Sequence, residues 1–211
     1  MKGIWFNQIH SYADLNLVLS NPVIPPAQVK TNYVDIPGAD GCADLTEAHG
    51  KVRYKNRECT FTFTVFPYDD FEQKKTEVSN LLNGHRCKII LDKDPEYYWE
   101  GRCAVNDYQS DKNLHKIVVG ASVAPYKLKI NPTNVIVSPG ENKVVNMQNG
   151  RKSAIPTIKC EADTTIKFGD TTFNFGAGTH RDLDIELVEG SNQVTVTSTQ
   201  PVEFTYQEGD L

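Results

Sequence analysis

The chain has 211 residues, of which 39% are hydrophobic, 23% charged and 9% aromatic, and this composition excludes a disordered, collagen-like or coiled-coil protein. It carries 22 Lys and Arg against 27 Asp and Glu, and the net charge of −5 argues against a protein that holds nucleic acid by neutralising phosphates. The surplus of acid is uneven, because residues 1–134 carry 16 basic and 16 acidic side chains whereas residues 135–211 carry 6 and 11.

Alternation of apolar and polar residues predicts a mainly β chain. The clearest case is Glu58–Phe66, where Cys59, Phe61, Phe63 and Val65 share one face and three threonines the other, as in a half-buried strand. The pattern predicts further strands in chain order. They are Lys51–Lys55, Cys87–Leu91, Tyr97–Asn106, Lys116–Val123, Ile155–Glu161, Thr165–Phe168, Thr171–Phe175, Arg181–Val188, Gln193–Ser198 and Val202–Tyr206.

One segment breaks the alternation. Acidic residues at its start, spaced apolar residues and Gly84 at its end predict a short capped helix from about Asp69 to Asn83. In the last third, glycine-centred turns predict two hairpins, at Phe168–Thr171 and at Glu189–Asn192. Regular short strands in this part are typical of a small β-sandwich.

A domain boundary is predicted near residue 134. Pro132 and Pro139 interrupt the strand pattern there, and the charge balance changes at the same place. We therefore expect a mainly β protein of two domains, namely a β-sandwich-like domain of residues 1–134, which contains the helix, and a smaller β-sandwich domain of residues 135–211.

The cysteines and the start of the chain bear on the compartment. Five cysteines without a C-x-x-C pair favour a reducing compartment over a disulfide framework or a zinc site. The first seven residues lack a long apolar stretch, and no run approaches 18 apolar residues, so we expect neither a signal peptide nor a membrane span. We expect the protein to be made and folded in a cytoplasm.

No local motif for catalysis or metal binding is present in the sequence. The five histidines stand apart, and there is no nucleophile elbow, P-loop, dinucleotide fingerprint or zincin motif. Carboxylates within Asp92–Glu100 and Asp182–Glu186 could supply a glycosidase-like pair, but the second set alternates with apolar residues as on a solvated strand face. Asp40–Asp44 lacks the oxygen spacing of a calcium loop. We predict no enzymatic activity and no cofactor.

Carbohydrate recognition by the second domain is an open alternative, because small β-sandwiches often bind sugars. Both tryptophans, Trp5 and Trp99, lie in the first domain. At least three of the phenylalanines in the second domain occupy alternating strand positions, where a role in the core explains them better. The aromatic residues of this domain are Phe168, Phe173, Phe175, Phe204 and Tyr206.

Three segments in the first domain carry a family resemblance. Tyr33–Gly41 is followed by Asp44–Glu47 and then by Val52–Arg57, which leads into the Thr/Phe strand. In this order and spacing they resemble the distal tail (Dit) protein family of siphoviruses and prophages of Gram-positive bacteria. Gly3–Asn7 and Leu17–Leu19 are similar to the start of that family, and the remainder of the chain is similar only in layout.

The resemblance implies a structural protein of the phage tail tip. In this family the first domains form a ring, usually a hexamer, at the distal end of the tail tube, and galectin-like second domains project outward. The implied partners are the major tail tube protein, the tape-measure protein and the tail-associated lysin, tail-tip or receptor-binding protein. DNA passes through the ring without specific binding, and the protein resides in the virion tail after assembly in the host cytoplasm. A neutral first domain suits such a conduit, since a basic one would retain phosphates.

Interface residues are expected in two segments, Ile4–Leu19 and Ile36–Glu47. In the second, glycines in the two turn dipeptides supply positive φ angles. We expect Arg57 to anchor this loop by pairing with Asp40 or Asp44. The structural or interface candidates are Trp5, Phe6, Tyr12, Pro37, Gly38, Asp40, Gly41, Asp44, Tyr54 and Arg57.

Overall fold

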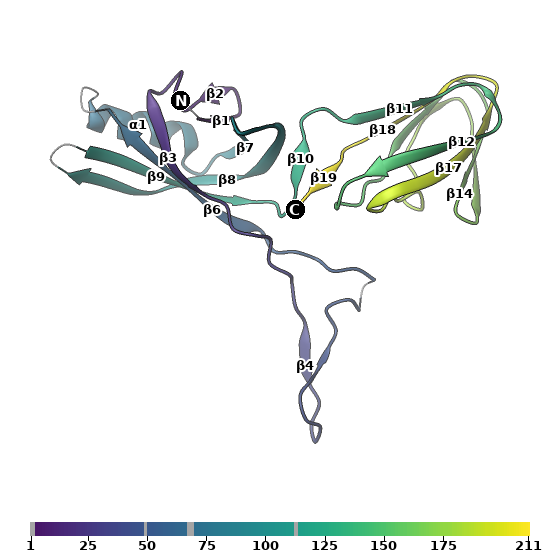
Figure 1. Ribbon diagram of the computed structural model, residues 1–211, viewed down its shortest axis with the longest axis horizontal. Coiled ribbons are helices and arrows are strands. Elements are labelled where there is room, and N and C mark those ends of the chain that lie inside the picture. The colour runs from purple at the N-terminus through teal and green to yellow at the C-terminus, as the bar shows by residue number, and fades with distance from the viewer. Residues whose placement is uncertain (1–2, 49, 67–69, 112–113) are drawn as a thin grey trace. The chain divides into compact units, whose positions relative to one another are not determined.

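The computed structural model describes residues 3–48, 50–66, 70–111 and 114–211. The chain divides into two compact units, residues 1–127 and 128–211 (Figure 1). The division lies earlier than the predicted position 134, because Lys129 N–H donates to Glu208 O and β11 (Thr133–Val137) pairs with β18 (Val202–Tyr206), so both belong with the C-terminal part of the chain. No helix in the described part of the chain is long and apolar enough to cross a membrane.

The main strands of the first unit form one antiparallel sheet. Its order is β2-β1-β7-β8-β9-β6-β3, so the predicted Thr/Phe strand β6 lies between β9 and β3. The strands are β1 (Ile4–Phe6), β2 (Ile9–His10), β3 (Leu17–Val23), β6 (Arg57–Val65), β7 (Arg86–Leu91), β8 (Asp94–Asp111) and β9 (Leu114–Val123).

The core of the first unit lies on the apolar face of this sheet. Phe61 and Phe63 of β6 are 1% and 0% exposed, as their alternation predicted. The Phe6 ring meets both edge-on, with centroids 6.3 and 6.1 Å away. Burying each such side chain contributes about 1.5–3 kcal/mol, so this aromatic group is a main source of stability in the unit.

The predicted helix is α1 (Phe71–Leu82). Asp70 is its N-cap, because the carboxylate accepts hydrogen bonds from the backbone N–H groups of Glu72 and Gln73. The apolar face of α1 buries Val78 and Leu82 in the core. The predicted first residue, Asp69, lies outside the described residues.

The second unit consists mainly of two four-stranded antiparallel sheets, so the predicted sandwich in the last third is confirmed. One sheet has the order β11-β18-β13-β16 and the other β12-β17-β14-β15, and β10 (Lys127–Lys129) pairs with β19 (Gly209–Asp210). Its core includes Met147, Ile158 and Phe204, all 0% exposed. The other strands are β12 (Gly140–Asn149), β13 (Thr157–Cys160), β14 (Thr164–Phe168), β15 (Thr171–Phe175), β16 (Gly178–His180) and β17 (Gly190–Ser198).

Three local predictions are wrong. Lys51–Lys55 forms only the isolated bridge between Tyr54 and Val29. Arg181–Val188 is not a strand, because only Leu187 finds a bridge partner, Ala154. Glu189–Asn192 is therefore not a hairpin but the entry to β17. The other predicted hairpin is confirmed, since Phe168 pairs with Thr171 across Gly169 and Asp170.

Candidate functional site

Hydrogen bonds to Asp92, which follows β7, hold the N-terminal segment beside the pairing of β1 with β7. His10 Nε2 lies 3.2 Å from Asp92 Oδ2, and the same oxygen accepts a hydrogen bond of 2.6 Å from the Gly3 N–H. Ala13 N–H donates to His10 Nδ1 at 3.0 Å, so the ring proton sits on Nε2, facing the carboxylate. A side chain at position 3 would meet the His10 ring at 2.4 Å, which explains the glycine there.

The electrostatics of this pair favour the ionised carboxylate. Partial burial raises the pKa of Asp92, but hydrogen bonds from Gly3 N–H and from His10 outweigh this, so the net pKa lies below its usual value. Sequence reasoning missed the pair because its members are 82 positions apart and form no local motif.

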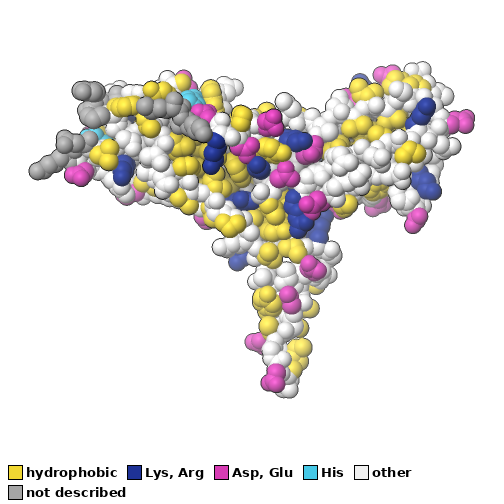
Figure 2. Space-filling view, viewed as in Figure 1, with side chains coloured by type: hydrophobic (Ala, Val, Ile, Leu, Met, Phe, Trp, Pro, Cys, Tyr) yellow, Lys and Arg dark blue, Asp and Glu magenta, His cyan; other side chains and the backbone are white. Residues whose placement is uncertain are grey.

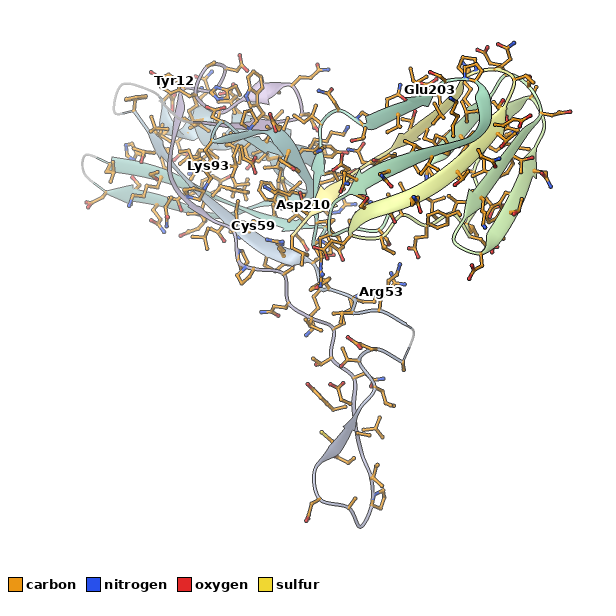
Figure 3. The ribbon with its side chains drawn as sticks, turned by 45° about the vertical axis from the view of Figure 1, so that its right-hand side comes forward. Tyr12, Arg53, Cys59, Lys93, Glu203 and Asp210 are labelled. Atoms are coloured by element: carbon orange, nitrogen blue, oxygen red, sulfur yellow. The ribbon has the colours of Figure 1, made fainter. Side chains whose placement is uncertain are left out.

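Three predicted interface residues of this segment have different environments. Phe6 is 2% exposed and belongs to the core, so it is not a surface residue in the isolated chain. Trp5 is 38% exposed, and its ring lies over His10 at a centroid distance of 4.7 Å. Tyr12 is half-buried in the turn that follows β2 (Figure 3).

The described residues 24–48 and 50–56, between β3 and β6, form a segment that we call the arm. Its strands β4 (Tyr33–Asp35) and β5 (Cys42–Asp44) pair with each other in a two-stranded sheet. Closer to β6, the arm continues as a two-chain ribbon, because Lys30 N–H donates to Arg53 O at 2.8 Å. In Figure 1, β4 lies on a narrow projection that extends away from β6. Figure 3 labels Arg53 on the returning chain of this ribbon.

The tip of the arm contains four predicted site residues. Ile36 O accepts a hydrogen bond from Ala39 N–H at 3.1 Å and closes a turn over Pro37 and Gly38. Gly38 and Gly41 have φ angles of 83° and 78°, which glycine adopts without strain. The predicted turns are therefore confirmed, and Asp40 lies between the two glycines. Asp44 follows in β5.

Large apolar side chains are exposed along the arm. Tyr33 is 57% exposed and Ile36 52%, although isoleucine is among the residue types most often buried and tyrosine is usually at least partly buried. Figure 2 shows hydrophobic side chains spread along the projection, with acidic ones among them. The apolar residues of the arm that are exposed in this way are Val29, Tyr33, Val34, Ile36 and Leu45.

Arg57 does not pair with either predicted aspartate. Its Nε donates to Pro125 O at 2.8 Å and its Nη1 to Pro25 O at 3.2 Å. The prediction was wrong because Arg57 starts β6 and is 7% exposed, at the base of the arm rather than near its tip. Burial lowers the pKa of this guanidinium. Arg57 therefore anchors the arm through backbone carbonyls.

The remaining base residue is Tyr54, which contacts Tyr126 edge-on at 5.7 Å between ring centroids. Asp44 Oδ1 accepts from Thr46 N–H at 2.9 Å, so this carboxylate stabilises the return from the tip, and the hydrogen bonds from Thr46 lower its pKa. The structure thus brings the predicted turn residues together at one end of the arm and Tyr54 and Arg57 together at the other. It leaves Trp5, Phe6 and Tyr12 in the N-terminal segment.

The carboxylates considered for catalysis are engaged elsewhere. Asp94 pairs with Lys127 at 2.7 Å and Glu100 with Arg86 at 2.9 Å, while Asp182 accepts from Asp184 N–H at 2.9 Å. In the described part of the chain, no three or more His, Cys, Asp or Glu side chains could together hold a metal ion. These contacts stabilise strands and turns and do not form a carboxylate pair around a cleft.

All five cysteines are free thiols. Cys42 is exposed in the arm, whereas Cys59, Cys87, Cys103 and Cys160 are buried. Burial raises the pKa of Cys59 to about 11. A hydrogen bond from Cys103 lowers the pKa of Cys87 to about 7, and the same contact raises that of Cys103. Cys42 is the thiol most open to reagents.

Comparison with solved structures decides the fold. The crystal structure of the SPP1 Dit protein (gp 19.1) matches with a TM-score of 0.76 and 15% sequence identity over 100% of both chains. The chain has the Dit fold. The SPP1 protein is described as a paradigm of the hub adsorption apparatus in phages that infect Gram-positive bacteria.

The other comparisons add little to the Dit match. A de novo designed double-stranded β-helix covers 37% of the chain at 18% identity, and its TM-score of 0.25 is too low to carry an argument. No family model and no curated protein matches the chain. The SPP1 match shows that the chain has the fold that the resemblance of the three arm segments and the Thr/Phe strand implied.

Proposed function

We propose that this chain is a structural subunit of a phage tail tip, and that it forms the hub joining the tail tube to the adsorption apparatus. The observation that carries the proposal is the match along the full length of a Dit hub protein. A fold can host several functions, so the match alone does not carry the role. The exposed apolar arm supplies a second, independent argument. Both arguments favour a protein that works through interfaces and not through a catalytic site.

The hub is a ring of about six copies, as the family resemblance implies. A ring requires two different patches on each subunit, since every copy contacts one neighbour with each patch. The arm supplies one such patch. Its side chains Tyr33, Ile36 and Leu45 are exposed in the single chain, and binding to a neighbouring subunit would bury them. Residues 36–47, predicted from the sequence, form the outer part of this patch.

The charge distribution fits a conduit for DNA. Residues 1–134 carry equal numbers of basic and acidic side chains, so a ring of these domains does not hold the phosphate backbone strongly. The ring binds the major tail tube protein and the tape-measure protein on one side. On the other side it binds the tail-tip, lysin or receptor-binding protein, and the sandwich of the second unit extends outward in the virion tail.

Light scattering after size exclusion, over a concentration series, tests the ring. We expect a species of about six times the 23.6 kDa chain mass, with a central hole in negative-stain images. A chain that stays monomeric at every concentration is then mixed with the tail tube protein. Monomers in both experiments would contradict the hub proposal.

A further inference from the structure

The main sheet of the first unit carries a basic patch on the face that points away from the core. Along β7, Cys87 and Ile89 are buried, whereas Arg86 and Lys88 alternate with them and are exposed. Arg102 of β8 lies directly opposite Arg86, so these two exposed cations share that face. Like charges opposite each other destabilise a sheet, so this arrangement points to a role outside the fold.

Apolar side chains extend this patch onto β1. Trp5 pairs with Ile90 and is exposed on the same face as Arg86 and Lys88. The Lys88 ammonium lies over the Tyr98 ring, 4.8 Å from the ring centroid. Trp and Arg are enriched at the centres of protein interfaces. The basic face, as we call this surface, consists of Trp5, Arg86, Lys88, Ile90 and Arg102.

The outer arm, residues 31–48, has the opposite charge. It contains Asp35, Asp40, Asp44 and Glu47, all exposed, and no Lys or Arg. The exposed apolar side chains of the arm are interspersed with these carboxylates. The outer arm is therefore acidic and apolar, whereas the basic face is cationic and apolar. Both surfaces belong to the first unit, so every copy of the chain carries one of each.

We propose that the outer arm of one copy docks on the basic face of the next copy in the ring. This inference rests on the hub proposal and names the second of the two patches that a ring requires. Arginine and lysine side chains form charge-assisted hydrogen bonds with the carboxylates of the arm, while Trp5 and Ile90 supply a surface for its apolar side chains. Opposite charges favour arm-to-face contacts over contacts between two arms or two faces, so the subunits join head to tail.

A polypeptide fits the basic face better than a nucleic acid does. Glu100 lies opposite Lys88 within the same face, and its carboxylate accepts a hydrogen bond of 2.9 Å from Arg86 Nε. This carboxylate repels phosphate groups, whereas Arg86 and Arg102 each keep further N–H groups that can donate to the arm. Trp5 and Ile90 match the apolar side chains of the arm and not a phosphate backbone.

Two double variants, each of which reverses the charge of one surface, test the proposal. The arm variant is Asp35→Lys, Asp40→Lys, and the face variant is Lys88→Glu, Arg102→Glu. All four side chains are exposed, and circular dichroism checks that both variants fold.

The control variant, Lys159→Glu, Lys167→Glu, changes the charge by the same amount as the face variant. Its two positions are exposed and lie in the second unit. Light scattering measures the mass of each protein alone and of an equimolar mixture of the arm and face variants. Where the natural chain needs the tail tube protein to assemble, the same samples contain it.

Each variant alone should repel itself, because its arm and its face carry charges of the same sign. In the mixture the two variants can alternate around a ring with an even number of subunits, and every arm then meets a face of opposite charge. We expect the ring fraction to fall about tenfold or more in each variant alone and to return to the natural level in the mixture. The control should assemble as the natural chain does.

A ring formed by either folded variant alone, or no ring in their mixture, would overturn the docking proposal, while a ring of the natural chain would still support the hub. Loss of the ring in the control would also overturn it, because any change of charge would then suffice. Duplex DNA that binds the natural chain and not the face variant would assign the basic face to nucleic acid instead. A natural chain that stays monomeric even with the tail tube protein would contradict the hub proposal itself.

Discussion

Strand β6 and the arm belong to the same unit but bury their apolar side chains to very different extents. In β6, Phe61 and Phe63 are at most 1% exposed, and the strand has hydrogen-bonded neighbours on both sides. In the arm, Tyr33 and Ile36 are more than half exposed, and β4 and β5 form a sheet of two strands. The apolar face of β6 is covered within the chain, whereas among the described residues no surface covers the exposed apolar side chains of the arm.

This difference separates what stabilises the unit from what connects it to other molecules. An isolated two-stranded hairpin is marginally stable in water, so the arm depends on its anchors at the base. A partner that covers the arm gains the free energy of burying side chains that the fold itself leaves exposed. Substitutions in β6 should therefore change folding, and substitutions in the arm should change assembly.

The largest effect should come from the outer arm. The double variant Ile36→Asp, Leu45→Asp places two charges on the exposed apolar patch, and we expect complete loss of the ring with no change in secondary structure. Light scattering and circular dichroism measure the two properties. Leu183→Asp is the matched control, because Leu183 is 75% exposed in the second unit. A ring that survives the double variant would remove the arm from the interface.

Truncation of a core side chain in β6 tests whether this strand, and not the arm, stabilises the fold. Phe63→Ala should lower the free energy of unfolding by about 3–5 kcal/mol, because it leaves a cavity beside Phe6. Ile36→Ala should change it by no more than about 0.5 kcal/mol. Urea unfolding followed by tryptophan fluorescence measures both, since Trp5 and Trp99 both lie in the first unit. Equal losses in the two variants would mean that the arm stabilises the fold.

Arg57 connects the two regions, and its removal should have an intermediate effect. Arg57→Ala should lower the free energy of unfolding by about 1.5–3 kcal/mol, because the carbonyls of Pro25 and Pro125 lose a charged hydrogen-bond donor. Asp40→Ala and Asp44→Ala serve as controls for the ion pair expected from the sequence. Urea unfolding should show a loss at Arg57 well above that of either aspartate. Equal losses of stability in Arg57→Ala and in one aspartate variant would support the ion pair between Arg57 and that aspartate.

Much of the fold could be predicted from the sequence because its strands alternate strictly. Glu58–Phe66 differs from the observed β6 by one residue at each end. The arm could not be predicted as a unit, because β4 and β5 have three residues each and expose nearly all of them, which leaves no alternation to detect. Arg181–Val188 shows the opposite case, because its residues alternate between apolar and polar but do not form a strand. Ile185 and Leu187 are buried, but Leu183 is exposed and the backbone lacks a strand partner.

The candidate sites were predictable only where they are local in sequence. The tip turns depend on two glycines with positive φ angles, and turn dipeptides reveal such positions directly. The partners of Arg57 and the His10–Asp92 pair depend on contacts between distant segments.

The smallest expected effect concerns the His10–Asp92 pair, which fastens the N-terminal segment to the sheet. The folded state holds the pKa of Asp92 below its usual value, so the stabilisation is fully present above about pH 4, where the carboxyl of the unfolded chain is also ionised. It is lost as the pH falls through the folded pKa. Because the carboxylate is partly exposed, we expect Asp92→Asn to cost no more than about 1 kcal/mol at pH 6. Urea unfolding at pH 6 and pH 3 should show the difference between the two proteins shrinking at the lower pH.

The same substitution at Asp40 in the arm should leave stability unchanged at both pH values. A difference at Asp92 that grows on acidification would show that the neutral carboxyl, and not the carboxylate, holds the N-terminal segment.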